Sequence, residues 1–96
     1  MPVVRAHTYA VEPADVEEFL ARRASLIGTV RETQPGLTRA LLLRLEDGTY
    51  CDIWHWETAA QMAAAFAAID TFPEVAPTMA LTRDATSRNG HLVDER

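Results

Sequence analysis

The start of the chain alternates between small apolar side chains and larger polar or aromatic ones. Because successive residues of a strand point to opposite faces, this period of two over residues 3–11 predicts a β-strand. Arg5, His7 and Tyr9 share one face of that strand, and small residues make up the other face. Small side chains allow close packing, so we expect helices to cover the small-residue face.

Two helices are predicted by apolar residues that recur at helical spacing. The first starts near Pro13, because proline is tolerated in the first turn of a helix, and it ends before Pro35 and Gly36. Its predicted apolar stripe comprises Val16, Phe19, Leu20, Ile27 and Val30. The second helix is rich in alanine and follows a Thr-x-x-Gln capping box at residues 58–61. A further short helical stretch is expected within residues 71–84.

Two apolar runs, residues 37–45 and 50–56, flank an Asp-Gly pair of the kind that hairpin turns favour. They are therefore predicted to be neighbouring antiparallel strands, and residues 91–93 are expected to form the last strand. This order of elements predicts an α+β fold of the ferredoxin-like β-α-β-β-α-β kind. Such a fold has a four-stranded antiparallel sheet with helices on one face, and we expect residues 1–96 to form a single domain.

Tyr50, Asp52, Trp54 and Trp56 share one face of the third predicted strand. A carboxylate is poorly tolerated between a sheet and its helices without a partner, so Asp52 suggests that this face has no helices on it. An uncovered face with two tryptophans would exceed the apolar patch that a monomer usually shows. We therefore predict that a second copy of the chain covers this face in a homodimer.

The composition is that of an ordinary globular protein, and it excludes several classes of function. With a formal net charge of -5 and a pI near 5.0, the chain lacks the clustered basic residues that nucleic-acid binding requires. The apolar runs are too short to span a bilayer, and the first residues do not resemble a secretion signal. A lone cysteine, Cys51, cannot form an intrachain disulfide. We expect a cytoplasmic protein with no nucleic-acid or membrane partner.

Two short motifs connect these elements to a known family. Pro35-Gly36 follows the first helix, and Trp56-Glu57-Thr58 ends the third strand. Together with the predicted layout, they resemble the antibiotic biosynthesis monooxygenase family of dimeric α/β barrels, over nearly the whole chain. The resemblance implies a homodimer with a cavity between helices and sheet in each subunit. Members of this family include cofactor-free oxygenases that convert anthrone-like phenols into quinones, and enzymes that degrade haem.

The resemblance to the quinone-forming members can be followed residue by residue. Their motif tryptophan corresponds to Trp56, and Asp52 stands where they have an asparagine four residues earlier. Met62 takes the place of their tyrosine, and Ala76 stands near the place of their arginine. The haem-degrading members have a tryptophan on the second helix and a histidine iron ligand after it, which this chain lacks. We therefore expect no haem, no other cofactor and no metal.

The first hypothesis that the resemblance implies is a cofactor-independent monooxygenase, in which an aromatic, phenolic substrate itself reduces oxygen. Such chemistry requires an apolar pocket, a base that deprotonates the substrate, and donors that stabilise the negative charge. His7 is a candidate base because imidazole titrates near neutral pH. Asp52 is the other candidate base, because burial beside aromatic rings would raise the pKa of its carboxylate. The candidate catalytic residues are Asp52, His7 and Trp56. The candidate substrate-binding residues are Trp54, Tyr9, Tyr50, Arg39 and Met62.

Each of these residues also has a purely structural interpretation. His7 could lie at a dimer interface, and Asp52 could pair with Arg5 or Arg39 across the sheet. The two tryptophans could form the core of an interface instead of stacking on a flat aromatic ligand. The alternative hypothesis is therefore a non-catalytic small-molecule-binding or structural dimer on the same fold. The absence of the family tyrosine and arginine favours this alternative.

Overall fold

A computed structural model describes residues 2–96 and confirms the predicted α+β fold. The main elements are β1 (Val3–Val11), α1 (Val16–Thr33), β2 (Leu37–Arg44), β3 (Tyr50–Trp56), α2 (Ala59–Ala67), α3 (Val75–Met79) and β4 (Thr82–His91). The strands form one antiparallel sheet in the order β2-β3-β1-β4, which is the ferredoxin-like arrangement. Within the described residues, no helix is both long and apolar enough to cross a membrane.

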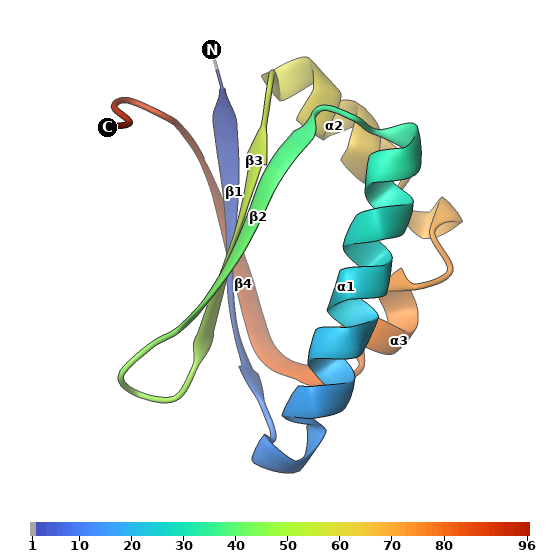
Figure 1. Ribbon diagram of the computed structural model, residues 1–96, viewed down its shortest axis with the longest axis vertical. Helices are drawn as coiled ribbons and strands as arrows, with labels where there is room; N and C mark the ends of the chain where they lie inside the picture. Colours follow the sequence, from blue (N-terminus) through green and yellow to red (C-terminus); the bar gives the residue numbers. More distant parts are fainter. Residues whose placement is uncertain (1) are drawn as a thin grey trace.

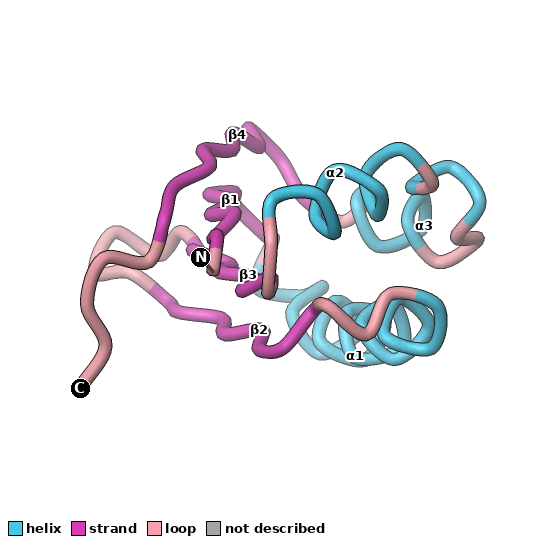
Figure 2. Tube along the Cα trace, turned by 90° about the horizontal axis from the view of Figure 1, so that it is seen from above, coloured by secondary structure: helices cyan, strands magenta, loops and turns pink. Residues whose placement is uncertain are grey.

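The helices lie on one side of the sheet, and the other side is uncovered (Figures 1 and 2). The long helix α1 runs along β2 and β3 in these views, while α2 and α3 form a second row beside it. Short 3₁₀ turns precede α1 and follow α2, at Pro13–Asp15 and Ile69–Thr71. The cavity described below lies in the space between these helices and the sheet.

Local sequence signals explain where several elements begin. The Thr58 hydroxyl accepts a hydrogen bond from the backbone N–H of Gln61 at 3.1 Å, so the predicted helix cap of α2 is confirmed. At the hairpin between β2 and β3, Gly48 has a φ of 87°, a conformation that costs glycine little. The carboxylate of Asp47 accepts hydrogen bonds from both the backbone N–H and the hydroxyl of Thr49.

The prediction of which sheet face meets the helices was wrong. Asp52, Trp54 and Trp56 point toward the helices, and both tryptophans belong to a buried core with Val30 of α1 and Ala65 of α2. The small residues of β1 lie on the uncovered face instead. The prediction assumed that Asp52 would lack a partner under the helices, but α1 supplies one.

The last strand is also not where it was predicted. β4 spans Thr82–His91, whereas the sequence suggested residues 91–93. Almost every side chain of β4 is exposed, so the strand lacks the apolar alternation that identifies a half-buried strand. Its ladder with β1 shifts register between Thr8 and Ala10, and Asp84 has a φ of 55° at this bulge.

Candidate functional site

A cavity of about 260 Å³ lies between the sheet and the helices. β1 and β3 form its floor, α1 forms one wall, and the segment from Phe66 to Met79 forms the other. Its apolar lining consists of Phe19, Leu26, Trp54, Phe66, Ile69, Val75 and Met79. Arg5, His7, Tyr9, Arg23, Asp52 and Thr78 complete the lining. An apolar cavity with a few converging polar groups is the usual form of a small-molecule site.

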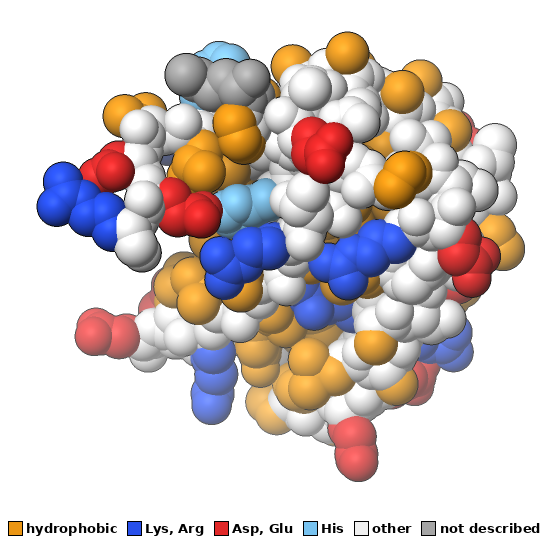
Figure 3. Space-filling view, turned by 45° about the horizontal axis from the view of Figure 1, so that its top comes forward, with side chains coloured by type: hydrophobic (Ala, Val, Ile, Leu, Met, Phe, Trp, Pro, Cys, Tyr) orange, Lys and Arg blue, Asp and Glu red, His pale blue; other side chains and the backbone are white. Residues whose placement is uncertain are grey.

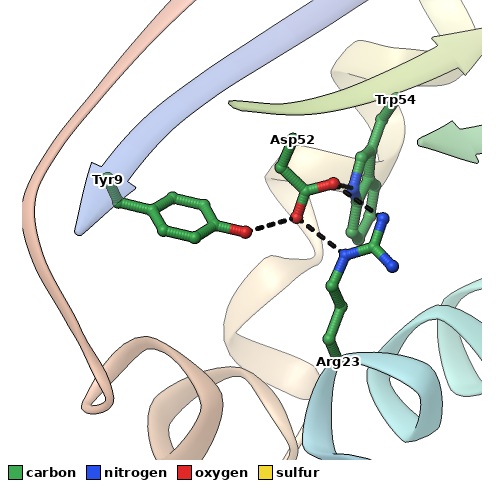
Figure 4. A network of polar contacts seen from close by, with 4 residues as sticks. All are labelled: Tyr9, Arg23, Asp52 and Trp54. Atoms are coloured by element: carbon green, nitrogen blue, oxygen red, sulfur yellow. Dashed lines mark hydrogen bonds and ion pairs between the residues drawn. The ribbon is translucent and has the colours of Figure 1, made fainter. Parts of the chain in front are cut away.

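Asp52 is the centre of a polar network on the cavity floor, drawn in Figure 4. Asp52 lies on β3 and is only 4% exposed. Each of its two carboxylate oxygens accepts two hydrogen bonds. Tyr9 donates its hydroxyl to Oδ2 at 2.7 Å, and Trp54 donates Nε1–H to Oδ1 at 2.9 Å. Arg23 of α1 binds both oxygens, from Nε at 2.9 Å and from Nη2 at 2.8 Å. Asp52 therefore has its charge paired and its acceptor sites occupied.

The charge of Asp52 keeps its two neighbours protonated. Burial and the nearby Asp52 carboxylate raise the pKa of Tyr9 well above its usual value, so its hydroxyl stays a neutral donor. Burial alone would lower the pKa of Arg23, but the hydrogen bonds and charge of Asp52 outweigh it, and the pKa is raised. The network is thus a neutral phenol and a guanidinium bound to one carboxylate.

His7 lies beside this network on β1, where it pairs with Asp52 in the sheet ladder. Its ring makes edge contacts with Trp54 and Phe66, at centroid distances of 6.4 and 6.5 Å. Arg5 donates Nε–H to His7 Nε2 at 2.8 Å, so that nitrogen carries no proton. Burial and the charge of Arg5 lower the pKa of His7, while Asp52 opposes them. His7 is therefore a neutral imidazole at neutral pH.

The comparison with protein families decides what kind of scaffold carries this cavity. The model of the family described as "Antibiotic biosynthesis monooxygenase" matches residues 2–73. The chain belongs to this family. The family predicted from the two short motifs is therefore confirmed. A comparison with curated protein sequences gave no match.

Solved structures with the same fold support this assignment. A variant of SnoaB, a cofactor-independent oxygenase from Streptomyces nogalater, is 26% identical to this chain, and the TM-score is 0.71. The match covers 99% of this chain and 94% of that chain. Rv0793 from Mycobacterium tuberculosis is 15% identical, with a TM-score of 0.74 and coverage of 99% and 98%. A conserved protein from Methanosarcina mazei Go1 is 16% identical, with a TM-score of 0.74 and coverage of 95% and 92%. The two less similar structures show the fold alone.

In this antibiotic biosynthesis monooxygenase family member, half of the residues predicted for the site line the cavity. They are His7, Tyr9, Asp52 and Trp54. The others lie elsewhere. Trp56 is 1% exposed in the core, Tyr50 stacks on Tyr9 outside the cavity lining, and Met62 packs against the core. Arg39 pairs with His55 in the sheet ladder and lies on the uncovered face, so it cannot serve as a donor in the cavity of its own subunit.

Sequence reasoning missed Arg23, which holds Asp52. A signal for it exists, because Arg23 is spaced at helical intervals from Phe19, Leu26 and Val30, all of which are buried. An arginine in the apolar stripe of a helix points at a buried acceptor. Leu20, which was assigned to that stripe, is 46% exposed instead.

The described residues offer no protein-only metal centre. Within residues 2–96, no group of three or more histidine, cysteine or acidic side chains lies close enough together to hold a metal ion. Asp52 is engaged by Tyr9, Arg23 and Trp54, and the Nε2 lone pair of His7 is engaged by Arg5. The cavity therefore presents the guanidinium groups of Arg5 and Arg23 and aromatic surfaces, a set that suits an aromatic ligand with a negatively charged oxygen.

Proposed function

We propose that this protein is a cofactor-independent monooxygenase that acts on a phenolic aromatic small molecule and works as a homodimer. The observation that carries the proposal is a neutral imidazole, His7, placed in an aromatic-walled cavity beside Trp54 and Phe66. Family membership and the likeness to SnoaB, a cofactor-independent oxygenase, support the reaction type. Action in the cytoplasm stays a prediction from the sequence.

In the proposed reaction, His7 accepts a proton from the substrate, whose carbanion then donates electrons to O₂. One oxygen atom becomes the carbonyl oxygen of the product. The other leaves as water with the two hydrogen atoms of the oxidised CH₂ carbon. That carbon loses four electrons and O₂ gains four, so the substrate and O₂ balance the reaction. Trp54 would stack on the substrate ring, and Tyr9 stays a neutral part of the floor.

Asp52 supports a second candidate function, a binding protein without catalysis. Both oxygens of its carboxylate are engaged by Tyr9, Arg23 and Trp54, which leaves one of the two predicted bases in a structural role. A cavity with this floor binds a flat ligand whether or not a proton is transferred. The two candidates share the site and differ only in whether His7 accepts a proton.

Oxygen uptake separates the two candidates. We expect the purified protein, without added cofactor, to consume O₂ with at least one member of a panel of anthrone-type and dihydroxynaphthalene-type phenols, and to form one carbonyl product per O₂. An oxygen electrode and product chromatography make the measurement, with boiled protein as the control for autoxidation. Binding of panel members without oxygen uptake above that control would favour the binding protein.

The homodimer part of the proposal rests on the uncovered face of the sheet. Leu41, Leu43 and Ile53 lie on that face with the small apolar residues of β1, because the ladder places them opposite one another. Leu41 and Leu43 are among the exposed large hydrophobic residues of the described chain. Exposed apolar side chains gathered on one sheet face are typical of a surface that another protein covers. The predicted dimer therefore keeps its support, although the face differs from the one predicted.

Leu43→Asp is expected to convert the dimer into a monomer, because a carboxylate buried at an apolar interface is not tolerated. Light scattering at micromolar concentration should change from twice the chain mass of 10.7 kDa to that mass. Leu20→Asp is the matched control, since Leu20 is 46% exposed, Leu43 is 47% exposed, and Leu20 lies on α1. A wild-type protein that is already monomeric, or a control that dissociates equally, would contradict this prediction.

A further inference from the structure

The charges around the cavity do not cancel. Its charged lining residues are Arg5, Arg23 and Asp52, and the ion pair between Arg23 and Asp52 neutralises two of them. His7 and Tyr9, the other titratable groups of the lining, are neutral for the reasons given above. The cavity therefore keeps one positive charge, although the whole chain has a formal net charge of -5.

Arg5 holds that remaining charge against the cavity wall. Its guanidinium lies over the ring of Phe66, 4.2 Å from the ring centroid. It donates hydrogen bonds to His7 Nε2 at 2.8 Å, to Asn89 Oδ1 at 3.2 Å and to Ser87 Oγ at 3.1 Å. All three acceptors are uncharged, and no carboxylate of residues 2–96 lies within ion-pair distance of it. Arg5 is thus fixed in position without a counter-ion.

One face of the molecule also shows basic side chains beside apolar surface (Figure 3). The chain contains no lysine, so every basic side chain in Figure 3 is an arginine. In that view, basic side chains lie close together across the middle of the molecule with hydrophobic atoms next to them, and acidic side chains are more widely spread. A positive region next to apolar surface attracts ligands that combine a ring with a negative charge.

We propose that Arg5 is the anion-binding residue of the cavity and that it selects aromatic ligands with an ionised oxygen substituent, a carboxylate or an enolate. This inference rests on the proposed function for the identity of the site, but it concerns binding and not oxygen chemistry. Two nitrogens of the Arg5 guanidinium, Nη1 and Nη2, donate to exposed, neutral acceptors on Asn89 and Ser87. A ligand carboxylate can take the place of these acceptors and form stronger, charge-assisted hydrogen bonds.

Anion binding at Arg5 also has a consequence for His7. In the structure without ligand, the Nε–H of Arg5 occupies the Nε2 lone pair of His7. A ligand carboxylate that also accepts the Nε–H of Arg5 makes that lone pair available to accept a proton. Arg5 is therefore a specificity residue that also controls when His7 can act as a base.

The test uses a matched pair of probes, 1-hydroxy-2-naphthoate and 1-hydroxy-2-naphthamide, which share the ring and the phenol and differ in charge. By isothermal titration calorimetry, the wild-type protein should bind the carboxylate about 10- to 100-fold more tightly than the amide. Arg5→Gln should remove that preference because carboxylate binding weakens more than amide binding, whereas Arg5→Lys should keep part of it. Arg44→Gln, which removes one exposed positive charge outside this cavity, should keep the full preference.

Several outcomes would overturn the assignment of Arg5. These are equal affinity for both probes, no binding of either probe to the wild-type protein, or the same loss of preference in the Arg44 variant. Thermal melting of each variant shows whether it is folded. Oxygen uptake is measured separately, so the two proposals fail in different ways. A preference for the carboxylate without oxygen uptake would support the role of Arg5 and contradict the monooxygenase proposal. Oxygen uptake without a charge preference would support the monooxygenase proposal and contradict the role of Arg5.

Discussion

Replacing Asp52 with asparagine is expected to lower the free energy of unfolding by about 3 to 5 kcal/mol. The substitution keeps the shape of the side chain but leaves the guanidinium of Arg23 buried without its counter-ion. The two side chains are only 6% and 14% exposed, so water cannot replace the lost charge. In a chain of this size, the melting temperature should fall by more than about 12 °C. Chemical denaturation and thermal melting measure both quantities.

Asp70→Asn is the matched control, because Asp70 is exposed and the same substitution there should change stability by less than about 0.5 kcal/mol. A double variant, Asp52→Leu with Arg23→Met, removes both charges and should recover much of the lost stability. Unchanged melting of Asp52→Asn would contradict a structural role for the ion pair. It would restore Asp52 as a candidate base, in particular if oxygen uptake were lost.

Replacing His7 with glutamine is expected to lower kcat for oxygen uptake by about 10²- to 10⁴-fold, the usual contribution of a general base. Glutamine can still accept the Nε–H of Arg5 through its Oε1, but it cannot take a proton from the substrate. The fold should therefore remain intact and the melting temperature nearly unchanged. His91→Gln, at the exposed end of β4, is the matched control and should keep wild-type activity.

The pH dependence gives a second measurement of the same role. A base must be deprotonated to act, and burial with the charge of Arg5 lowers the pKa of His7 from 6.5. The wild-type rate should therefore stay constant down to pH 6.5 and decrease below it, as the imidazole becomes protonated. The free energy of unfolding should decrease over the same range, because the unfolded chain binds the proton more readily. A residual rate of His7→Gln with the same acid limb as the wild type would exclude His7.

The sequence predicted those strands whose two faces have different surroundings. β1 and β3 were predicted with their observed bounds, because their side chains alternate in size and polarity. β4 has polar, exposed residues on both faces, so a pattern based on burial could not reveal it. Hydrophobic periodicity predicts which side chains of a strand are buried, so it cannot identify a strand whose side chains are all exposed.

The orientation of the sheet could not be read from one strand at a time. Asp52 argued for an uncovered face only while its partner was unknown, and that partner, Arg23, is 29 residues away on α1. The prediction that Tyr9, Asp52 and Trp54 share one sheet face was correct. The prediction that this face lies away from the helices was wrong. The sequence therefore predicted that Tyr9, Asp52 and Trp54 share a face, whereas their place on a cavity floor depends on how the helices pack.

The polar strand β4 also determines how copies of this protein can meet. β2 and β4 are the edges of the sheet, and an edge strand offers unpaired backbone groups to any passing chain. β4 combines exposed charged residues with the bulge at Asp84, whose left-handed backbone interrupts a regular ladder. Charges and bulges at an edge discourage continuation of the sheet into a neighbouring molecule. The polar residues that concealed this strand in the sequence also oppose edge-to-edge aggregation, which is consistent with the proposed dimer through the apolar face.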